Sequence, residues 1–289
     1  MYVWHMGGRI ERGLSLTGRS LQLIGRRPQL LVLPLLSMLS VGAATAALLG
    51  PWALDAIAHH SRWQIFIDSA VLAYPSVFLS TFFGVGFVLM ADAAFDGRDL
   101  SVGAALRGAL ERLPAIAAWA LVSTLVGVAL RAIEELPGVG GVAGRIVAWV
   151  ADTAWSLATL FVVPALAVEG VGPLAAARRS ASVIRSRWGE SVVGSFAIGS
   201  AAAVAMFGAA ALALLGWVVR GTSPLAGDAI IAAAALAVLL TAVIASAASQ
   251  AFRLAVFRYA ADGRLVGPYT ESELMASFAS RPRGRWAAR

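Results

Sequence analysis

Cysteine and lysine are both absent from this chain of 289 residues, and charged residues of any kind are scarce. Without cysteine there is no disulfide, no thiol nucleophile and no thiolate metal ligand. Charged residues make up 13% of the sequence, whereas soluble domains carry about 25%. Hydrophobic residues make up 59% and the mean hydropathy is +0.79. Too few charges remain to cover a water-facing surface, so the composition predicts a membrane protein with several spans.

Side chains suited to catalysis or cofactor binding are also few. The three histidines, His5, His59 and His60, do not share a helix face with acidic residues, so no zinc site is expected. The glycine-rich segment 138–141 follows a predicted membrane helix and the chain has no lysine, so we interpret it as a turn rather than a phosphate loop. No serine stands in a nucleophile elbow. We therefore expect no catalytic residue, no cofactor and no metal, and predict that the protein is not an enzyme.

Six long apolar runs predict the fold class. A spanning helix needs about 20 apolar residues, and runs of that length lie at about residues 29–54, 66–92, 114–133, 145–168, 191–219 and 228–257. We predict an all-α, polytopic membrane protein whose six transmembrane helices form three hairpins joined by amphipathic cytoplasmic helices. Residues 1–265 are the expected membrane domain. Residues 266–289 are expected to form a short amphipathic helix and a basic cytoplasmic tail.

Similar motifs recur where one hairpin ends and the next begins. Each hairpin ends in an acidic residue followed by glycine, at Asp96, Glu169 and Asp262, and each begins after a basic segment that reads GRRP, ERLP or SRWG. We predict an internal repeat of surface helix, span, span and acid–glycine joint, about 75–90 residues long. Chance matching of short motifs is the alternative.

The segments between the hairpins have helical spacing of apolar residues. The two internal stripes are Val102, Leu106, Leu110 and Leu113, and Ala177, Ala181, Ile184 and Trp188. Residues 8–27 alternate arginine with apolar positions, which predicts a further amphipathic helix. That helix lies either at the membrane surface or packed under the bundle.

Arginine supplies all 23 basic residues, and its placement predicts the orientation. The termini and the two internal joints carry 19 of the 23, and the hairpin loops carry the other four. The positive-inside rule then places both termini and the joints in the cytoplasm of a multi-pass protein. The alanine and arginine content suggests a GC-rich genome, and we expect the bacterial cytoplasmic (plasma) membrane.

The basic joints also predict the partners. Each arginine near an anionic leaflet contributes about 1 kcal/mol to lipid attraction, and the candidate contacts are Arg12, Arg19, Arg26, Arg27, Arg178, Arg179, Arg185 and Arg187. Basic and aromatic residues are not interleaved on a soluble domain, so nucleic acid is not expected. The expected partners are the lipid bilayer, with anionic lipids, and either a second copy of the chain or another membrane protein.

Two sets of polar residues lie within the spans. Asp152, Ser156 and Thr159 fall on one face of the fourth span, and an intramembrane acid is a functional-site hypothesis. The alternative is that Asp152 lies near the interface and pairs with Arg145 or Arg131.

The second set predicts a link between helices. Arg253 lies near the cytoplasmic end of the sixth span, at a depth comparable with Asp92 and Glu169. It either forms an ion pair with one of them or extends its guanidinium to the headgroups.

Parts of the sequence resemble a known family. RGLSLxxRSLxLIxRRPQLLVLPLLS near the start, WSLATLFVVPALAVEGVGPLAAARRS, and RWGESVVGSFAIG resemble a family of uncharacterised prokaryotic integral membrane proteins, a domain of unknown function, over residues 8–262. The EGxxxxxAxxRS joint is also similar to the membrane domain attached to some glycerophosphodiester phosphodiesterases. Their catalytic domain is absent here, so that similarity implies no phosphodiesterase activity.

Two function classes remain open at this point. The first is a non-enzymatic protein with a structural, assembly or lipid-organising role, favoured by the basic joints and the lack of catalytic groups. The second is a transporter or channel for a small solute or ion that uses the polar face around Asp152.

Overall fold

The computed structural model describes residue 18 and residues 22–55, 62–134, 142–187 and 193–267, and all regular structure in these residues is helical. Within these residues, six helices are long and apolar enough to cross a membrane, which confirms the predicted fold class. They lie at Pro28–Leu48, Ala70–Phe95, Leu113–Ile133, Gly144–Val168, Ala202–Arg220 and Pro224–Asp262. The chain forms two units, one of Arg27–Ser182 and one of Met1–Arg26 with Val183–Arg289, and each is described by itself.

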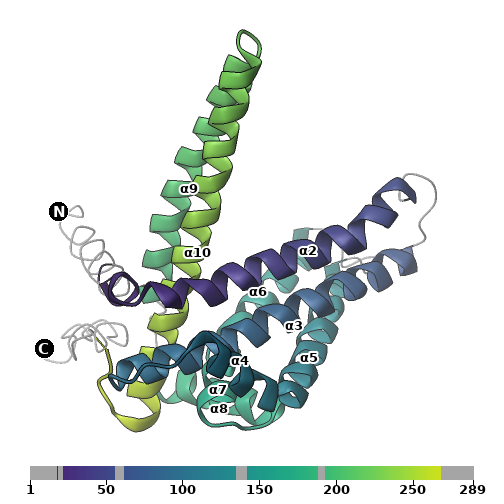
Figure 1. Ribbon diagram of the computed structural model, residues 1–289. Helices are drawn as coiled ribbons and strands as arrows, with labels where there is room; N and C mark the ends of the chain where they lie inside the picture. The colour runs from purple at the N-terminus through teal and green to yellow at the C-terminus, as the bar shows by residue number, and fades with distance from the viewer. Residues whose placement is uncertain (1–17, 19–21, 56–61, 135–141, 188–192, 268–289) are drawn as a thin grey trace, which may run out of the picture. The chain divides into compact units, whose positions relative to one another are not determined.

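The unit Arg27–Ser182 holds the first two hairpins. Its elements are η1 (Pro28–Leu31), α2 (Val32–Asp55), α3 (Arg62–Phe95), α4 (Val102–Glu111), α5 (Leu113–Glu134), α6 (Val142–Ala158), α7 (Val162–Val168) and most of α8 (Pro173–Arg187). Helix α2 packs on α3, and α5 packs on α6 (Figure 1). Helix α3 also contacts α4, α5 and α7, so it is the central helix of this unit.

The sequence of α3 suits its central place. Its second half is mostly apolar, with Ser80, Thr81 and Asp92 as the exceptions, and Val85, Phe87 and Val88 are fully buried. Small residues let neighbours approach closely. A Cβ atom added at Gly108 of α4 would lie 2.7 Å from the Leu89 side chain, so α4 rests directly against α3.

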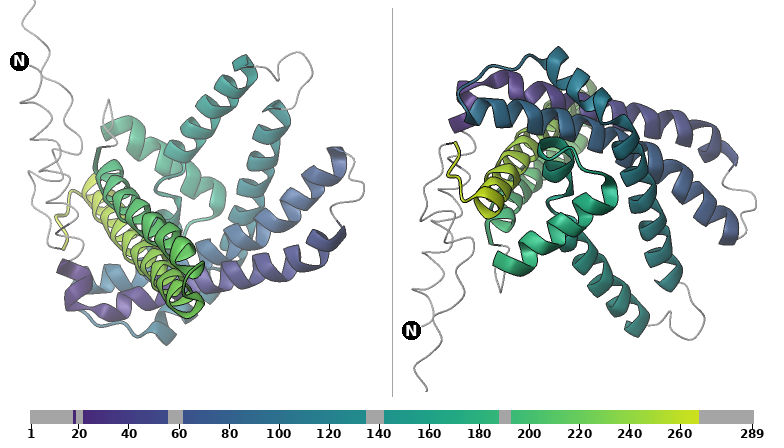
Figure 2. Two further views of the ribbon diagram at one scale, coloured as in Figure 1. Left: turned by 90° about the horizontal axis from the view of Figure 1, so that it is seen from above. Right: turned by 90° about the horizontal axis from the view of Figure 1, so that it is seen from below.

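The other unit is built on the third hairpin. Helices α9 (Val193–Arg220) and α10 (Pro224–Asp262) lie side by side in both views of Figure 2. Proline at the first position of α10 suits a helix start, because its missing N–H is not needed there. An ion pair between Arg220 Nε and Asp228 Oδ1, 3.0 Å apart, spans the turn. Helix α10 extends beyond the predicted span at both ends.

The fourth span is divided. The sequence predicts one span over residues 145–168, but α6 ends at Ala158 and α7 begins at Val162. Pro164 explains the break, because it cannot donate to the carbonyl of Leu160 and its ring crowds that carbonyl. Within the same unit, Pro75 is accommodated inside the continuous helix α3.

Several predictions fall outside the described residues. These are the segment 138–141, His59 and His60, Trp188, and nearly all of the tail 266–289. Of the N-terminal helix, residues 18 and 22–26 are described and helical, with Leu23 and Ile24 buried and Arg26 exposed. Arg12 and Arg19 lie outside the described part.

Candidate functional site

The three acid–glycine joints share an unusual backbone conformation. Gly97 has φ +74°, Gly170 has φ +63° and Gly263 has φ +68°. These values lie in the left-handed region, where a residue with a Cβ atom is strained, and glycine there is a common way to end a helix. The recurring glycine in the sequence therefore marks the same local event three times.

Hydrogen bonds show how two of these helices end. At the end of α3, Gly97 N–H donates to Ala94 O at 3.1 Å and Arg98 N–H donates to Ala93 O at 2.9 Å. This pair of bonds is the Schellman motif. At the end of α10, Gly263 N–H donates to Tyr259 O at 3.0 Å, which is the simpler left-handed cap.

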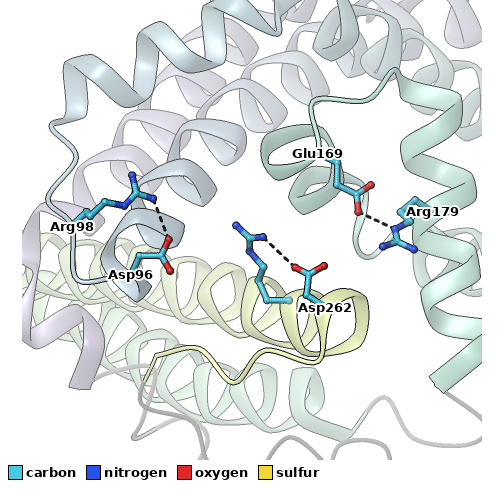
Figure 3. A network of polar contacts seen from close by, with 6 residues as sticks. Asp96, Arg98, Glu169, Arg179 and Asp262 are labelled. Carbon is cyan, nitrogen blue, oxygen red and sulfur yellow. Dashed lines mark hydrogen bonds and ion pairs between the residues drawn. The ribbon is translucent and has the colours of Figure 1, made fainter.

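The acid of each joint pairs with a nearby arginine, as Figure 3 shows. The N···O distances are 3.1 Å for Arg98–Asp96, 2.9 Å for Arg179–Glu169 and 3.3 Å for Arg258–Asp262. All three pairs are partly exposed, so each contributes only about 0–1 kcal/mol. The acids therefore serve local structure at the ends of the hairpins.

Two further arginines connect the beginning of a hairpin to its end. Arg27 forms an ion pair with Asp99 and donates to Arg98 O at 2.7 Å. Arg112 donates from Nε to Leu166 O at 3.2 Å and from Nη1 to Gly108 O at 2.8 Å. This role of both residues was not predicted from the sequence, although the motifs GRRP and ERLP that contain them were a signal.

The joint glycines give a direct test. We expect Gly170→Ala to lower the free energy of unfolding by about 1–2 kcal/mol, because a Cβ atom is strained at a left-handed φ. Gly172→Ala is the matched control, since a Cβ there meets nothing within 4 Å and its φ is not in the left-handed range. Denaturant unfolding of both variants checks this, and equal stability would contradict the cap.

The joint helices bury small residues and expose leucine. In α4, Ala105 and Ala109 are fully buried, whereas Leu110 is 53% exposed. Leu113 of the predicted apolar stripe is the first residue of α5 and is 36% exposed. Val102 and Leu106 of the same stripe are half-buried, so only its C-terminal half faces away from the unit. The close approach of α4 to α3 admits only small side chains between them.

Helix α8 follows the same rule. It buries Ala176 and Ser180, while Leu174 is 61% exposed. The predicted stripe positions Ala177, Ala181 and Ile184 are half-buried.

The predicted lipid-binding arginines divide into two groups. Arg26, Arg178 and Arg185 are exposed, whereas Arg27 and Arg179 are engaged in the ion pairs with Asp99 and Glu169. The side chain of Arg187 lies outside the described part.

Ser180 of α8 supplies a hydrogen-bond acceptor at the break in the fourth span. Its Oγ accepts a hydrogen bond from Phe161 N–H at 3.0 Å, and Ser180 is completely buried. Phe161 is the residue that precedes α7. Helix α8 and the divided fourth span are therefore linked by a hydrogen bond at this point.

The structure separates Thr159 from the other two members of its set. Asp152 and Ser156 are exposed on α6. Thr159 follows the end of α6, and its hydroxyl donates to Trp155 O at 2.8 Å. Asp152 makes no hydrogen bond or ion pair with another residue in the described ranges, including Arg131 and Arg145.

Arg253 belongs to the second unit, and Asp92 and Glu169 belong to the first. Their pairing therefore stays a prediction. Within α10, Gln250 Nε2 donates to Ser246 Oγ at 3.1 Å, in the turn before Arg253. Among the described residues, no group of three or more histidine or acidic side chains is placed to hold a metal ion.

A match over most of the chain decides the family. Residues 65–267 match a family of unknown function, DUF6159. The chain belongs to DUF6159. The match begins after α2, so the arginine-rich motif near the start of the chain lies outside it, and it includes the acid–glycine joints at Asp96, Glu169 and Asp262. No curated protein matches the chain.

Proposed function

We propose that this DUF6159 protein is a non-enzymatic protein of the bacterial cytoplasmic membrane that organises anionic lipids at its cytoplasmic joints. The exposed leucines of the joint helices carry this proposal. Leu110 of α4, Leu113 at the start of α5 and Leu174 of α8 are exposed, although leucine favours burial. Both termini and both joint helices lie on the cytoplasmic side, as the arginine distribution favours.

The bilayer surface suits both kinds of exposed side chain on these helices. Full burial of a leucine contributes about 1.5–3 kcal/mol, and the acyl region supplies such an environment. Arg178 and Arg185 are exposed on α8 within reach of headgroups, and each adds about 1 kcal/mol near an anionic surface. An amphipathic helix of this composition lies in the interface plane.

An internal repeat accounts for the similar joints. Three hairpins end in an acid paired with arginine and a glycine with positive φ. Arg27 and Arg112 each reach from the beginning of a hairpin to its end. The proposed repeat gives the protein several equivalent cytoplasmic corners at which lipid can be held.

Lipid retention tests the proposed function. In nanodiscs that contain phosphatidylglycerol and phosphatidylcholine, we expect the protein to retain phosphatidylglycerol preferentially, as native mass spectrometry would show. Arg178→Gln and Arg185→Gln should each lower that preference severalfold, because a headgroup contact is lost.

The control is Arg131→Gln, in the last turn of α5 at the other end of the hairpin. It should leave the preference unchanged. Equal retention of the two lipids by the unaltered protein would overturn the proposal, and so would equal losses in all three variants.

Transport of a small solute or ion is the second candidate. The broken fourth span favours it, because discontinuous helices form the binding sites of many transporters. Asp152 and Ser156 lie on α6 just before the break. If ion or solute flux into proteoliposomes is the same for Asp152→Asn as for the unaltered protein, this candidate fails.

A further inference from the structure

One face of α6 carries polar side chains that no described residue of the unit Arg27–Ser182 covers. Arg145, Trp149, Asp152 and Ser156 recur every three or four residues, so they share one face of the helix, which we call the α6 stripe. All four residues are exposed, and Trp149 is 67% exposed. The side of α6 that packs on α5 is a different one. It carries buried Ala148, and Trp155 stacks on Trp119 with ring centroids 5.9 Å apart.

The position of Asp152 makes this exposure costly in a membrane. The fourth span runs over Gly144–Val168, and Asp152 is about 12 Å along the helix from its first residue. Since about 20 residues suffice to cross the hydrocarbon layer, the side chain lies several ångströms inside it. Aspartate is too short to reach the headgroups from that depth. Carboxyl groups inside membranes therefore turn toward protein partners.

We propose that the α6 stripe is the contact between two copies of this chain. Two copies inserted with the same topology are related by a two-fold axis along the membrane normal, which brings residues of the same depth together. Asp152 then meets Asp152 of the second copy. A carboxyl group has two oxygen atoms that take part in hydrogen bonds, so each Asp152 offers the other copy a polar partner at its own depth. Ser156 adds a second such group one turn deeper.

The third hairpin of the same chain has fewer side chains that could form hydrogen bonds with the α6 stripe. Between residues 202 and 219, α9 has no hydrogen-bonding side chain except the indole of Trp217. Residues 229–245 of α10 contribute only Thr241. A second α6, in contrast, brings a carboxyl and a hydroxyl group at the required depth, together with the exposed ring of Trp149.

The absence of cysteine from this chain allows a direct test. A single Ser156→Cys substitution cannot form a disulfide within one chain, so oxidation in native membranes should give a covalent product with the mass of two copies. Leu125→Cys is the control. Leu125 is 59% exposed on α5, and it lies as many residues from Leu113 as Ser156 lies from Val168, so the depths match. No dimer with Ser156→Cys, or equal dimer with both variants, overturns the proposal.

The role of the carboxyl group is tested separately by energy transfer between labelled copies in liposomes. Asp152→Asn keeps a donor and an acceptor and should retain the dimer. Asp152→Leu removes both and should raise the dimer dissociation constant at least about tenfold, since two hydrogen bonds are lost per dimer. Size-exclusion profiles establish that both variants are folded. A monomeric unaltered protein at all lipid dilutions, or equal constants for the two variants, overturns the proposal.

A double variant tests whether the third hairpin covers the α6 stripe. If Ser156→Cys combined with Phe207→Cys on the exposed face of α9 gives an intramolecular disulfide while Ser156→Cys alone gives no dimer, α9 covers the stripe and the proposal is wrong. The lipid proposal is independent of this outcome, because it concerns α4 and α8.

Discussion

Replacing Gly227 by alanine is expected to cause the largest loss of stability among the substitutions considered. A Cβ atom at this position of α10 would lie 2.5 Å from both Cα and N of Arg220 in α9. Those atoms are backbone, so no side-chain rotation relieves the clash and the hairpin must open. We expect the free energy of unfolding to fall by about 2–3 kcal/mol, as for overpacking in a tight core. The fall should occur although alanine favours helix by about 1 kcal/mol.

Gly208→Ala in α9 is the matched control for this prediction. A Cβ atom at Gly208 meets nothing within 4 Å, so its expected effect is neutral or stabilising by up to about 1 kcal/mol. Unfolding of both variants in mixed micelles, followed by circular dichroism, measures the difference. If Gly227→Ala is as stable as Gly208→Ala, the backbones of α9 and α10 do not approach as closely at Gly227 as described.

Removing the Ser180 hydroxyl is expected to have the second largest effect. Ser180→Ala leaves the Phe161 N–H buried without its acceptor at the break between α6 and α7. An unsatisfied buried donor costs about 1–3 kcal/mol. We therefore expect a stability loss in that range, with faster amide exchange at residues 159–163 than in the unaltered protein.

Ser182→Ala provides the comparison within the same helix. Its hydroxyl donates to Arg179 O at 2.8 Å but is exposed, so water can replace the bond. The expected change is within about 0.5 kcal/mol. Amide exchange near residue 161 that is unaffected by Ser180→Ala would show that the hydroxyl does not hold the break.

The spans and their pairing were predictable because they depend on local composition. The uncharged run of residues 28–54 has to leave water, and short charged loops oblige neighbouring spans to form hairpins. The helix ends at the joints were equally predictable. Glycine after an acidic residue at positions 97, 170 and 263 is a local signal, and the structure places all three at positive φ.

The faces of the joint helices were not predictable in the same way. Helical spacing shows which residues share a face, but it does not show which face the protein covers. Leu110 is exposed and Ala109 is buried because α4 lies so close to α3 that only small side chains fit between them. That distance depends on packing between elements.

The candidate sites show the same division. The sequence by itself determined the class of protein, the six spans, the three joints and the presence of an acid within the fourth span, since each follows from residues close together in the chain. Only the tertiary structure decided that Arg112 donates to Leu166 O and that Ser180 Oγ accepts from Phe161 N–H at the break. It also decided that Asp152 faces outward. These contacts join residues on different helices, or depend on what a neighbouring helix leaves uncovered, and no local pattern encodes them.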